Sequence, residues 1–239
     1  MMAAPTDWAA RALALYDQSY ARRYREHDDQ FSTSEPCRRF AEWLQQASTE
    51  LPRPMDVLDL GCGTGRYFWT LDGVRELIGV DASPAMLAEA QRPYKRDRIT
   101  AERITLIEGD LFAQDFAPGR FSFVYSIGVL AEHVPFDATV VGHVSNWLKP
   151  GGVFAFTTVH PKSPSIPKTL KRRIGGAVAG VVPRRFGRPV RARLLAGGLY
   201  ADEVHISELI TPAFTIEALW RFVSEAHLHC WCVARKRNG

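Results

Sequence analysis

The chain has 239 residues, of which 46% are hydrophobic and 23% charged; this composition is typical of one globular domain and excludes a disordered chain. The longest apolar run, Ile174–Val182, has about nine residues, whereas a membrane-spanning helix needs about 20, so we expect no transmembrane segment. The formal net charge of +4 is uneven, because Lys162–Arg193 holds ten of the 30 Lys and Arg residues and no Asp or Glu. Such a segment favours an anionic partner, and a solvated basic face is the alternative.

The cysteines and the first residues of the chain bear on the compartment. Cys37 and Cys62 stand alone, Cys230 and Cys232 are two residues apart, and none of these spacings is typical of a zinc site. Free thiols in a chain of this size fit a reducing cytoplasm. The first residues lack the basic stretch and apolar core of a signal peptide. We therefore expect a cytoplasmic protein without a metal site.

The first 50 residues are predicted to form a helical cap, because their apolar residues recur at three- and four-residue spacing. From Met55 onward, short apolar runs alternate with helix-like stretches. The expected strands are Met55–Leu60, Glu76–Val80, Ile104–Ile107, Phe121–Ser126 and Val153–Val159. The expected helices are Gly65–Leu71, Pro84–Arg92, which Ser83 can cap, and Asp137–Leu148. This order predicts an α/β fold with a doubly wound, Rossmann-like and mostly parallel sheet.

Prolines and glycines interrupt the pattern after Val159. A regular pattern returns with an expected helix over Phe214–Ala226 and an expected strand over Leu228–Ala234, and Val204–Ile210 can supply one more strand. We interpret residues 161–203 as a basic insertion that forms a substrate lid on a core of residues 51–160 and 204–239. A helix on a membrane surface, an RNA contact and a plain basic loop are the alternatives for the insertion.

The strongest chemical signal is the run Val57–Gly65, in which an apolar strand contains Asp59 near its end and three alternate glycines follow. Glycine lets the backbone approach a ligand closely and adopt a positive φ. The spacing differs from the Gly-x-Gly-x-x-Gly of dinucleotide sites, and a carboxylate beside the turn would repel a pyrophosphate. The turn therefore favours an amino acid or a nucleoside as the ligand.

Two further acids belong to the next two strands: Asp81 ends the second strand and Asp110 follows the third. Ligands of open α/β sheets bind beyond the carboxyl ends of the strands, so we expect these acids and Asp59 at one edge. Asp81 can accept hydrogen bonds from ribose hydroxyls, and Asp110 can accept one from an adenine amino group.

With these motifs the chain resembles a class I S-adenosylmethionine-dependent methyltransferase of the small-molecule branch. The resemblance covers about Met55–Val159. Its motifs are Val57–Gly65, Gly79–Leu87, Glu108–Leu111, Phe121–Val134 and Leu148–Gly152. It implies S-adenosylmethionine as the cofactor and S-adenosylhomocysteine as its product. One departure is expected, because only one of the two closing strands common in the family is clear.

The resemblance also implies a set of cofactor-binding residues. The glycine turn would hold the methionine part, the acid of the second strand the ribose, and the end of the third strand the adenine. The residues after the fourth strand would line the transfer site. The run Ala21–Tyr24 is similar to the family's amino-terminal tyrosine pattern, with Tyr20 as the second candidate and helix packing as the alternative. The expected set is Tyr24, Asp59, Gly61, Gly63, Gly65, Asp81, Ala82, Met86, Asp110, Leu111, Ser126 and Ile127.

Two histidines are candidates for a catalytic base. Transfer of a methyl group from a sulfonium needs an aligned nucleophile and exclusion of water, and a base only where the attacking O, N or C atom must lose a proton. His160, directly after the fifth strand, is the first candidate, and His133, after the fourth, is the second. A structural role is the alternative for each.

We expect methyl transfer to O, N or C of a small-molecule acceptor, with an anionic group on the acceptor if the basic insertion contacts it. An RNA or tRNA methyltransferase that uses the insertion is the alternative. The fourth strand continues as Ser126-Ile127-Gly128-Val129, with neither the Asn/Asp-Pro-Pro-aromatic sequence nor the Pro-Cys nucleophile that are typical of enzymes acting on nucleic-acid bases, and this favours a small acceptor. The glycine spacing disfavours a nicotinamide-dependent oxidoreductase, and the intact motifs disfavour a binding protein without catalysis.

Overall fold

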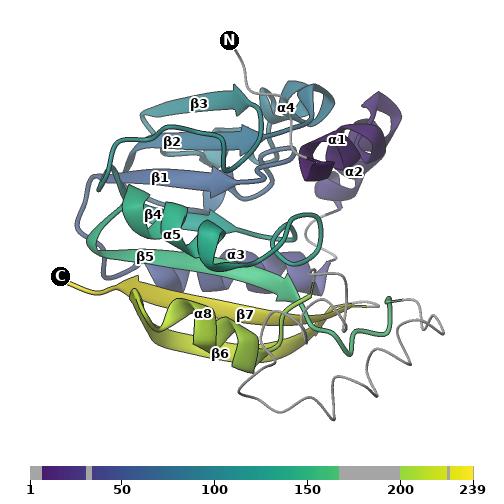
Figure 1. Ribbon diagram of the computed structural model, residues 1–239. Coiled ribbons are helices and arrows are strands. Elements are labelled where there is room, and N and C mark those ends of the chain that lie inside the picture. The colour runs from purple at the N-terminus through teal and green to yellow at the C-terminus, as the bar shows by residue number, and fades with distance from the viewer. Residues whose placement is uncertain (1–6, 31–33, 167–199, 225–226, 239) are drawn as a thin grey trace.

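The computed structural model describes residues 7–30, 34–166, 200–224 and 227–238, and Figure 1 shows one central sheet with helices on both faces. The strands are β1 (Met55–Leu60), β2 (Val74–Asp81), β3 (Arg103–Glu108), β4 (Phe121–Ser126), β5 (Leu148–Val159), β6 (Phe214–Ser224) and β7 (His227–Lys236). The α-helices are α1 (Asp7–Leu15), α2 (Gln18–Asp29), α3 (Glu35–Ser48), α4 (Pro84–Ala90), α5 (Ala138–Trp147) and α8 (Glu203–Ile210). Two short 3-10 helices are η2 (Phe68–Thr70) and η3 (Arg96–Arg98).

The sheet has the order β3-β2-β1-β4-β5-β7-β6. Strands β1 to β5 pair in parallel, and β7 pairs antiparallel with both β5 and β6. The chain therefore proceeds from β1 toward one edge and returns at β4 to proceed toward the other. A crevice forms at the carboxyl ends of β1 and β4, where ligands of such sheets bind. The predicted doubly wound, mostly parallel sheet is confirmed.

Helices cover both faces of the sheet because successive residues of a strand point to opposite faces. On the face nearer the viewer in Figure 1, Leu58 and Phe154 pack in one hydrophobic core with Val144 of α5. On the other face, Val57 packs in a second core with Leu44 of α3. All five side chains are fully buried. Helix α3 thus belongs to the sheet's covering layer, although it lies within the range 1–50 that the sequence assigns to the cap.

Five of the seven strands have the bounds expected from the sequence, to within a few residues, and β1 and β4 match them fully. The expected helices Pro84–Arg92 and Asp137–Leu148 are confirmed as α4 and α5. The Ser83 hydroxyl caps α4 by accepting a hydrogen bond from the Met86 N–H. Hydrophobic periodicity is sufficient to predict these elements, because each one combines a buried face with a clear capping or turn signal.

Two predictions near the carboxyl-terminal end are wrong: a segment predicted as a helix is a strand, and a segment predicted as a strand is a helix. Residues 214–224, expected as part of the helix Phe214–Ala226, form strand β6, which pairs antiparallel with β7 and packs Trp220 and Phe222 on aromatic side chains of α3. Residues expected as the strand Val204–Ile210 form α8, whose first turn is capped by Asp202. Both closing strands of the family are therefore present, and the expected departure from it is wrong.

The expected helix Gly65–Leu71 is also wrong. Turns follow the glycines, and the only helical residues of this segment form the single 3-10 turn η2. Strand β2 begins four residues after η2 ends. Most of the expected insertion, residues 167–199, lies outside the described residues. In the part of the chain that the structure describes, no helix is long and apolar enough to cross a membrane.

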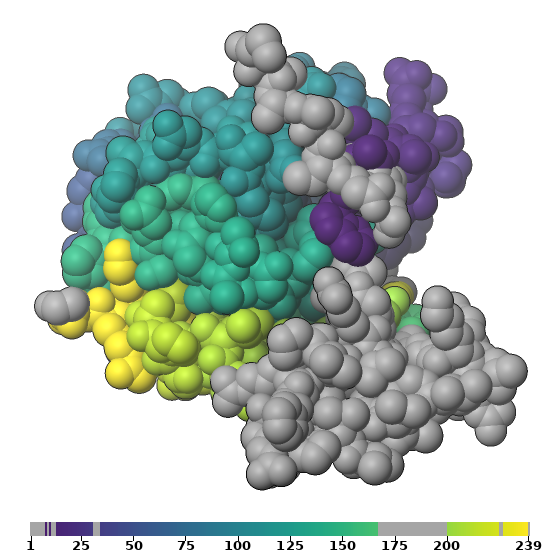
Figure 2. Space-filling view, viewed as in Figure 1, coloured from purple at the N-terminus to yellow at the C-terminus, as the bar shows by residue number. Residues whose placement is uncertain are grey.

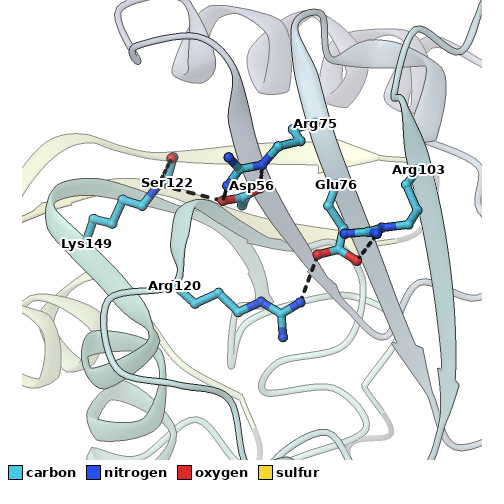
Figure 3. A network of polar contacts seen from close by, with 7 residues as sticks. All are labelled: Asp56, Arg75, Glu76, Arg103, Arg120, Ser122 and Lys149. Atoms are coloured by element: carbon cyan, nitrogen blue, oxygen red, sulfur yellow. Dashed lines mark hydrogen bonds and ion pairs between the residues drawn. The ribbon is translucent and has the colours of Figure 1, made fainter.

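A polar network occupies the amino-terminal edge of the sheet, opposite the crevice (Figure 3). Glu76 of β2 pairs with two guanidinium groups: its Oε1 accepts from Nε of Arg103 at 2.9 Å, and its Oε2 accepts from Nη2 of Arg120 at 2.8 Å. The second acid, Asp56, accepts from Nε of Arg75 at 2.9 Å. These pairs join β1, β2, β3 and the start of β4. The network comprises Asp56, Arg75, Glu76, Arg103, Arg120, Ser122 and Lys149.

The substitution Glu76→Gln should lower the free energy of unfolding by about 1–3 kcal/mol, since it removes an ionised acceptor from two guanidinium groups. Burial raises the pKa of Glu76, but Arg120 and Arg103 outweigh it and lower the pKa overall. The stabilisation is therefore complete above the ordinary glutamate pKa of about 4.3 and disappears as pH falls further. Urea unfolding at pH 7 and pH 3 measures both effects. Exposed Glu102→Gln is the control and should stay within about 0.5 kcal/mol of the parent; an equal loss there would contradict the prediction.

Candidate functional site

A cavity opens at the carboxyl ends of the strands, between the sheet and the helices α1 and α2 (Figure 1). In the space-filling view these two helices, in purple, lie against the teal part of the molecule that contains β2 to β4 (Figure 2). The cavity has an empty volume of about 680 Å³ including its open mouth, within the range of small-molecule sites. Its lining residues are Trp8, Tyr16, Tyr24, Gly61, Gly63, Asp81, Ala82, Met86, Asp110, Leu111, Ile127, Gly128, Val129, His133 and Val134.

The glycine turn forms the floor of this cavity. The N–H of Gly61 donates to the carbonyl of Val80 at 2.8 Å, which ties the turn to the end of β2. Gly61 has φ +77°, and a Cβ built on it would lie 2.4 Å from Cγ2 of Val129. Gly63 has φ +54° and faces the cavity beside Met86. The turn needs glycine at both positions, because positive φ strains other residues and the first position has no room for a side chain.

Asp81 joins the glycine turn to the turn after β2. Its Oδ2 accepts from the N–H of Gly63 and its Oδ1 from the N–H of Ser83, both at 2.9 Å. Burial raises its pKa, and the backbone donors of Ser83, Gly63 and Ala82 only partly offset this. A carboxylate with unused acceptor positions therefore faces the cavity, suited to hydroxyl or cationic groups.

Asp59 lies one layer deeper, within β1. It is 3% exposed, and burial raises its pKa well above the ordinary value. Tyr125 of β4 lies beside it, and the buried Tyr125 hydroxyl has no hydrogen-bond partner that meets normal geometry within the described residues. Neither Asp59 nor Asp81 forms an ion pair in the described chain. The floor of the site is thus rich in carboxylates without a cation.

Aromatic side chains of α1 and α2 form the opposite wall of the cavity. Tyr24 of α2 lies under the guanidinium of Arg66, whose central carbon is 4.3 Å from the ring centroid. Tyr16, between α1 and α2, accepts a hydrogen bond at its carbonyl from the Ser83 hydroxyl at 2.7 Å. Trp8 of α1 completes this wall. The cap is therefore attached to loops that form the floor.

Tyr16 and His133 meet in the cavity. The Tyr16 hydroxyl lies 2.6 Å from Nε2 of His133, and Oε1 of Glu132 is 3.9 Å from the same nitrogen. Burial lowers the pKa of His133 and raises that of Tyr16, so both are neutral near pH 7. Burial also raises the pKa of Glu132 to about 7. These neutral forms match a hydrogen bond from the Tyr16 O–H to the unprotonated Nε2.

His160 lies elsewhere. It follows β5 and is 4% exposed, but it does not line the cavity. Its Nδ1 accepts from the N–H of Lys162 at 3.0 Å, and its Nε2 lies 3.5 Å from Oε2 of Glu203. Burial lowers its pKa, although Glu203 acts in the opposite direction. One ring nitrogen of His160 thus accepts from the turn after β5, and the other faces the first residue of α8.

Nine of the 12 expected cofactor-binding residues line the cavity. The other three lie around it without lining it. Asp59 lies beneath the floor, Gly65 has φ +73° at the end of the turn, and the Ser126 hydroxyl donates to the carbonyl of Leu60 at 2.8 Å. The sequence interpretation missed Trp8, Tyr16, Gly128, Val129 and Val134. Tyr16 had a signal, because it precedes Tyr20 and Tyr24 at four-residue spacing.

Comparison with known proteins agrees with this arrangement. The family described as "Methyltransferase domain" matches residues 57–152, which include the glycine turn and strands β1 to β4. Residues 57–152 thus form a methyltransferase domain. A magnesium protoporphyrin IX methyltransferase from Synechocystis PCC 6803, solved with bound SAH, has the same fold with a TM-score of 0.61. It is 17% identical, and the match covers 96% of this chain and all of that one.

Curated relatives match over shorter ranges. A ubiquinone biosynthesis O-methyltransferase of Burkholderia multivorans is 29% identical over 158 residues, which are 64% of this chain and 66% of the relative. The human methyltransferase-like protein 27 is 36% identical over 118 residues, which are 48% of this chain and 45% of the relative. The chain therefore spans less than two thirds of the length of the curated relatives it matches.

Alanine at Gly61 should destabilise the protein by about 1–3 kcal/mol, because the substitution forces a positive φ on a side chain that meets Val129. Gly142 is the matched control: it lies within α5, and a Cβ there meets nothing within 4 Å. Gly142→Ala should stabilise the protein by about 0.4–1 kcal/mol. Urea unfolding of both variants at pH 7 checks these opposite signs. A neutral Gly61→Ala would contradict the geometry of the turn.

Proposed function

We propose that this chain binds S-adenosylmethionine in the cavity and transfers its methyl group to a small-molecule acceptor. The single observation that supports this most is the cavity itself, in which the glycine turn, Asp81 and Asp110 line the carboxyl edge of the sheet opposite an aromatic cap. The methyltransferase domain of residues 57–152 supports the same reaction class. When bound, this cofactor supplies a methyl group on a positively charged sulfur, already activated toward nucleophiles.

The chemistry of the lining fits this cofactor. The buried acids Asp59 and Asp81 have no cationic partner in the described chain, and a ligand with sulfonium and ammonium charges would supply one. The close approach permitted at Gly61 suits a ligand that lies against the backbone. In our assignment Gly61 and Gly63 hold the methionine part and Asp81 the ribose.

The adenine would lie farther along the same edge. Met86 of α4 and Leu111 supply apolar surface, and Asp110 lines the cavity after β3. Ile127, after β4, lies in the wall nearest to the loop that contains His133. We assign the transfer site to this side of the cavity, where Tyr16 and His133 meet.

The described lining also suggests the chemistry of the acceptor. Beyond the proposed cofactor residues it consists mainly of Trp8, Tyr16, Val129, His133 and Val134, and it contains no Lys or Arg. Carboxylates on the floor would repel an anion at the reacting end. We therefore propose an acceptor with an apolar or aromatic body and a neutral hydroxyl or amine as nucleophile. Contact of an anionic group with the basic segment, most of which lies outside the described residues, stays a prediction, and so does the RNA alternative.

Tyr16 and His133 offer a path for the acceptor's proton. The Tyr16 O–H can pass its proton to Nε2 of neutral His133 while its oxygen receives the proton of the acceptor. Ionised Glu132, 3.9 Å from Nε2, would stabilise the protonated imidazole. Between the two expected bases we retain His133, because it lines the cavity and His160 does not.

Asp81→Ala should weaken S-adenosylhomocysteine binding at least tenfold, or about 1.4 kcal/mol, since a hydrogen-bonded carboxylate on the floor is lost. Isothermal titration calorimetry with S-adenosylhomocysteine measures the affinity. Exposed Asp115→Ala should bind like the parent and controls for the loss of charge. An unchanged affinity for Asp81→Ala would remove the ribose assignment.

His133→Gln should lower kcat at least tenfold with little change in S-adenosylhomocysteine affinity, because the proton acceptor is lost while the floor stays intact. Burial lowers the pKa of His133, so the parent's kcat/KM should rise with pH through a step below about 6.5, and a second rise should follow near pH 7 as Glu132 ionises. The first step should be absent in His133→Gln, and the second should be absent in Glu132→Gln.

His160→Gln makes the same change at the other histidine. We expect its turnover per folded enzyme to stay within about twofold of the parent, because His160 lies outside the cavity. A large loss of kcat at His160 with a normal His133→Gln would reverse the assignment of the base. Turnover can be followed by formation of S-adenosylhomocysteine with a panel of phenols and amines.

A further inference from the structure

Asp28 of α2 is a fully buried acid that the proposed reaction does not use. Its two carboxylate oxygens accept from the hydroxyl of Thr64 and from Nε of Arg66. Thr64 and Arg66 stand on either side of Gly65 in the glycine turn, and Thr64 is also fully buried. A single side chain of the cap is therefore bound to two residues of the turn that forms the floor of the cavity.

The guanidinium of Arg66 is enclosed by α2 and α3. Its Nη2 lies 3.4 Å from Nδ1 of His27, and its Nη1 donates to Sγ of Cys37 at 3.5 Å. Its central carbon lies 4.3 Å from the centroid of the Tyr24 ring. Tyr24 precedes Asp28 by four residues, so both lie on one face of α2. Arg66 thus contacts both the acid and the aromatic residue of α2 that lines the cavity.

The energetics favour a single position for this contact. A buried ion pair that loses one partner leaves an uncompensated buried charge. If α2 moved away from the turn, Asp28 and Arg66 would lose each other as partners, so the helix cannot move unless both groups become exposed to water. Neighbouring Asp29 differs: its side chain is 63% exposed and, among the described residues, forms an ion pair with Arg25, one turn earlier on the same helix. Surface pairs of that kind contribute little.

We propose that Asp28, Thr64 and Arg66 form a clamp that couples the cofactor-binding turn to the cap, with Asp28 as the positioning residue that holds Tyr24 on the cavity wall. The inference rests on the proposed function, because it assigns to the clamp the task of transmitting cofactor binding to α2. Ordering of residues 61–66 by the cofactor then also orders residues 18–29.

The test compares Asp28→Asn with Asp29→Asn, the same substitution at the neighbouring exposed position. S-adenosylhomocysteine affinity is measured by calorimetry, and amide hydrogen exchange is measured with and without this ligand. In the parent and in Asp29→Asn, we expect the ligand to slow exchange in both residues 61–66 and residues 18–29. In Asp28→Asn we expect affinity at least tenfold weaker and, at saturating ligand, slowed exchange in residues 61–66 alone.

A residue that only stabilised the fold would raise exchange throughout the chain and leave the coupling between these two segments intact. Thr64→Val provides the second variant, since it removes one hydrogen bond and keeps the ion pair. If circular dichroism shows that Asp28→Asn does not fold, the Thr64→Val variant tests the clamp instead. We then expect a several-fold weaker affinity for S-adenosylhomocysteine and reduced ligand protection of residues 18–29 in Thr64→Val.

Three outcomes overturn the proposal or its basis. Parent-like affinity in Asp28→Asn, or ligand protection of residues 18–29 that persists in it, contradicts the clamp while leaving the proposed function in place. If Asp28→Asn does not fold, parent-like affinity and ligand protection in Thr64→Val also contradict the clamp and leave the proposed function in place. A parent chain that does not bind S-adenosylhomocysteine contradicts the proposed function, and the coupling with it.

Discussion

The arrangement of the site depends on the Asp81 carboxylate and the two backbone N–H groups it accepts. These bonds hold the turn after β1 and the turn after β2 at a fixed separation. Ser83, whose N–H is one of the donors, caps α4 with its hydroxyl and also donates to the carbonyl of Tyr16. The positions of the floor, of α4 and of the cap therefore follow from a single acid at the end of a strand.

The electrostatic cost of the site is already present in the protein without ligand. Asp59 and Asp81 are desolvated, and no Lys or Arg of the described chain pairs with them. A cationic ligand would relieve part of this cost, whereas a dinucleotide would add two phosphate charges to it. The difference explains in physical terms why the same sheet topology can serve such different ligands: selection depends on the charges at the strand ends rather than on the sheet.

Sequence reasoning predicted the central part of the fold and the floor of the site. Both depend on local signals: a short, mostly apolar run for β1, glycines that must adopt positive φ, and acids at strand ends. It failed where tertiary contacts decide. Phe214–Ser224 has apolar residues compatible with a helix, and only their packing on α3 and β7 makes it a strand. Tyr16 and His133 are 117 residues apart, so no spacing could reveal their hydrogen bond.

The position of β7 has a consequence for how the chain acquires its structure. This strand lies between β5 and β6 and pairs with both, so residues 227–236 complete a sheet whose other members precede them in the chain. During synthesis, the edge of β5 that pairs with β7 would stay unpaired until residues 227–236 have left the ribosome. Assembly of the sheet is therefore late and dependent on contacts distant in the chain, and a folding factor that shields that edge would act in this interval.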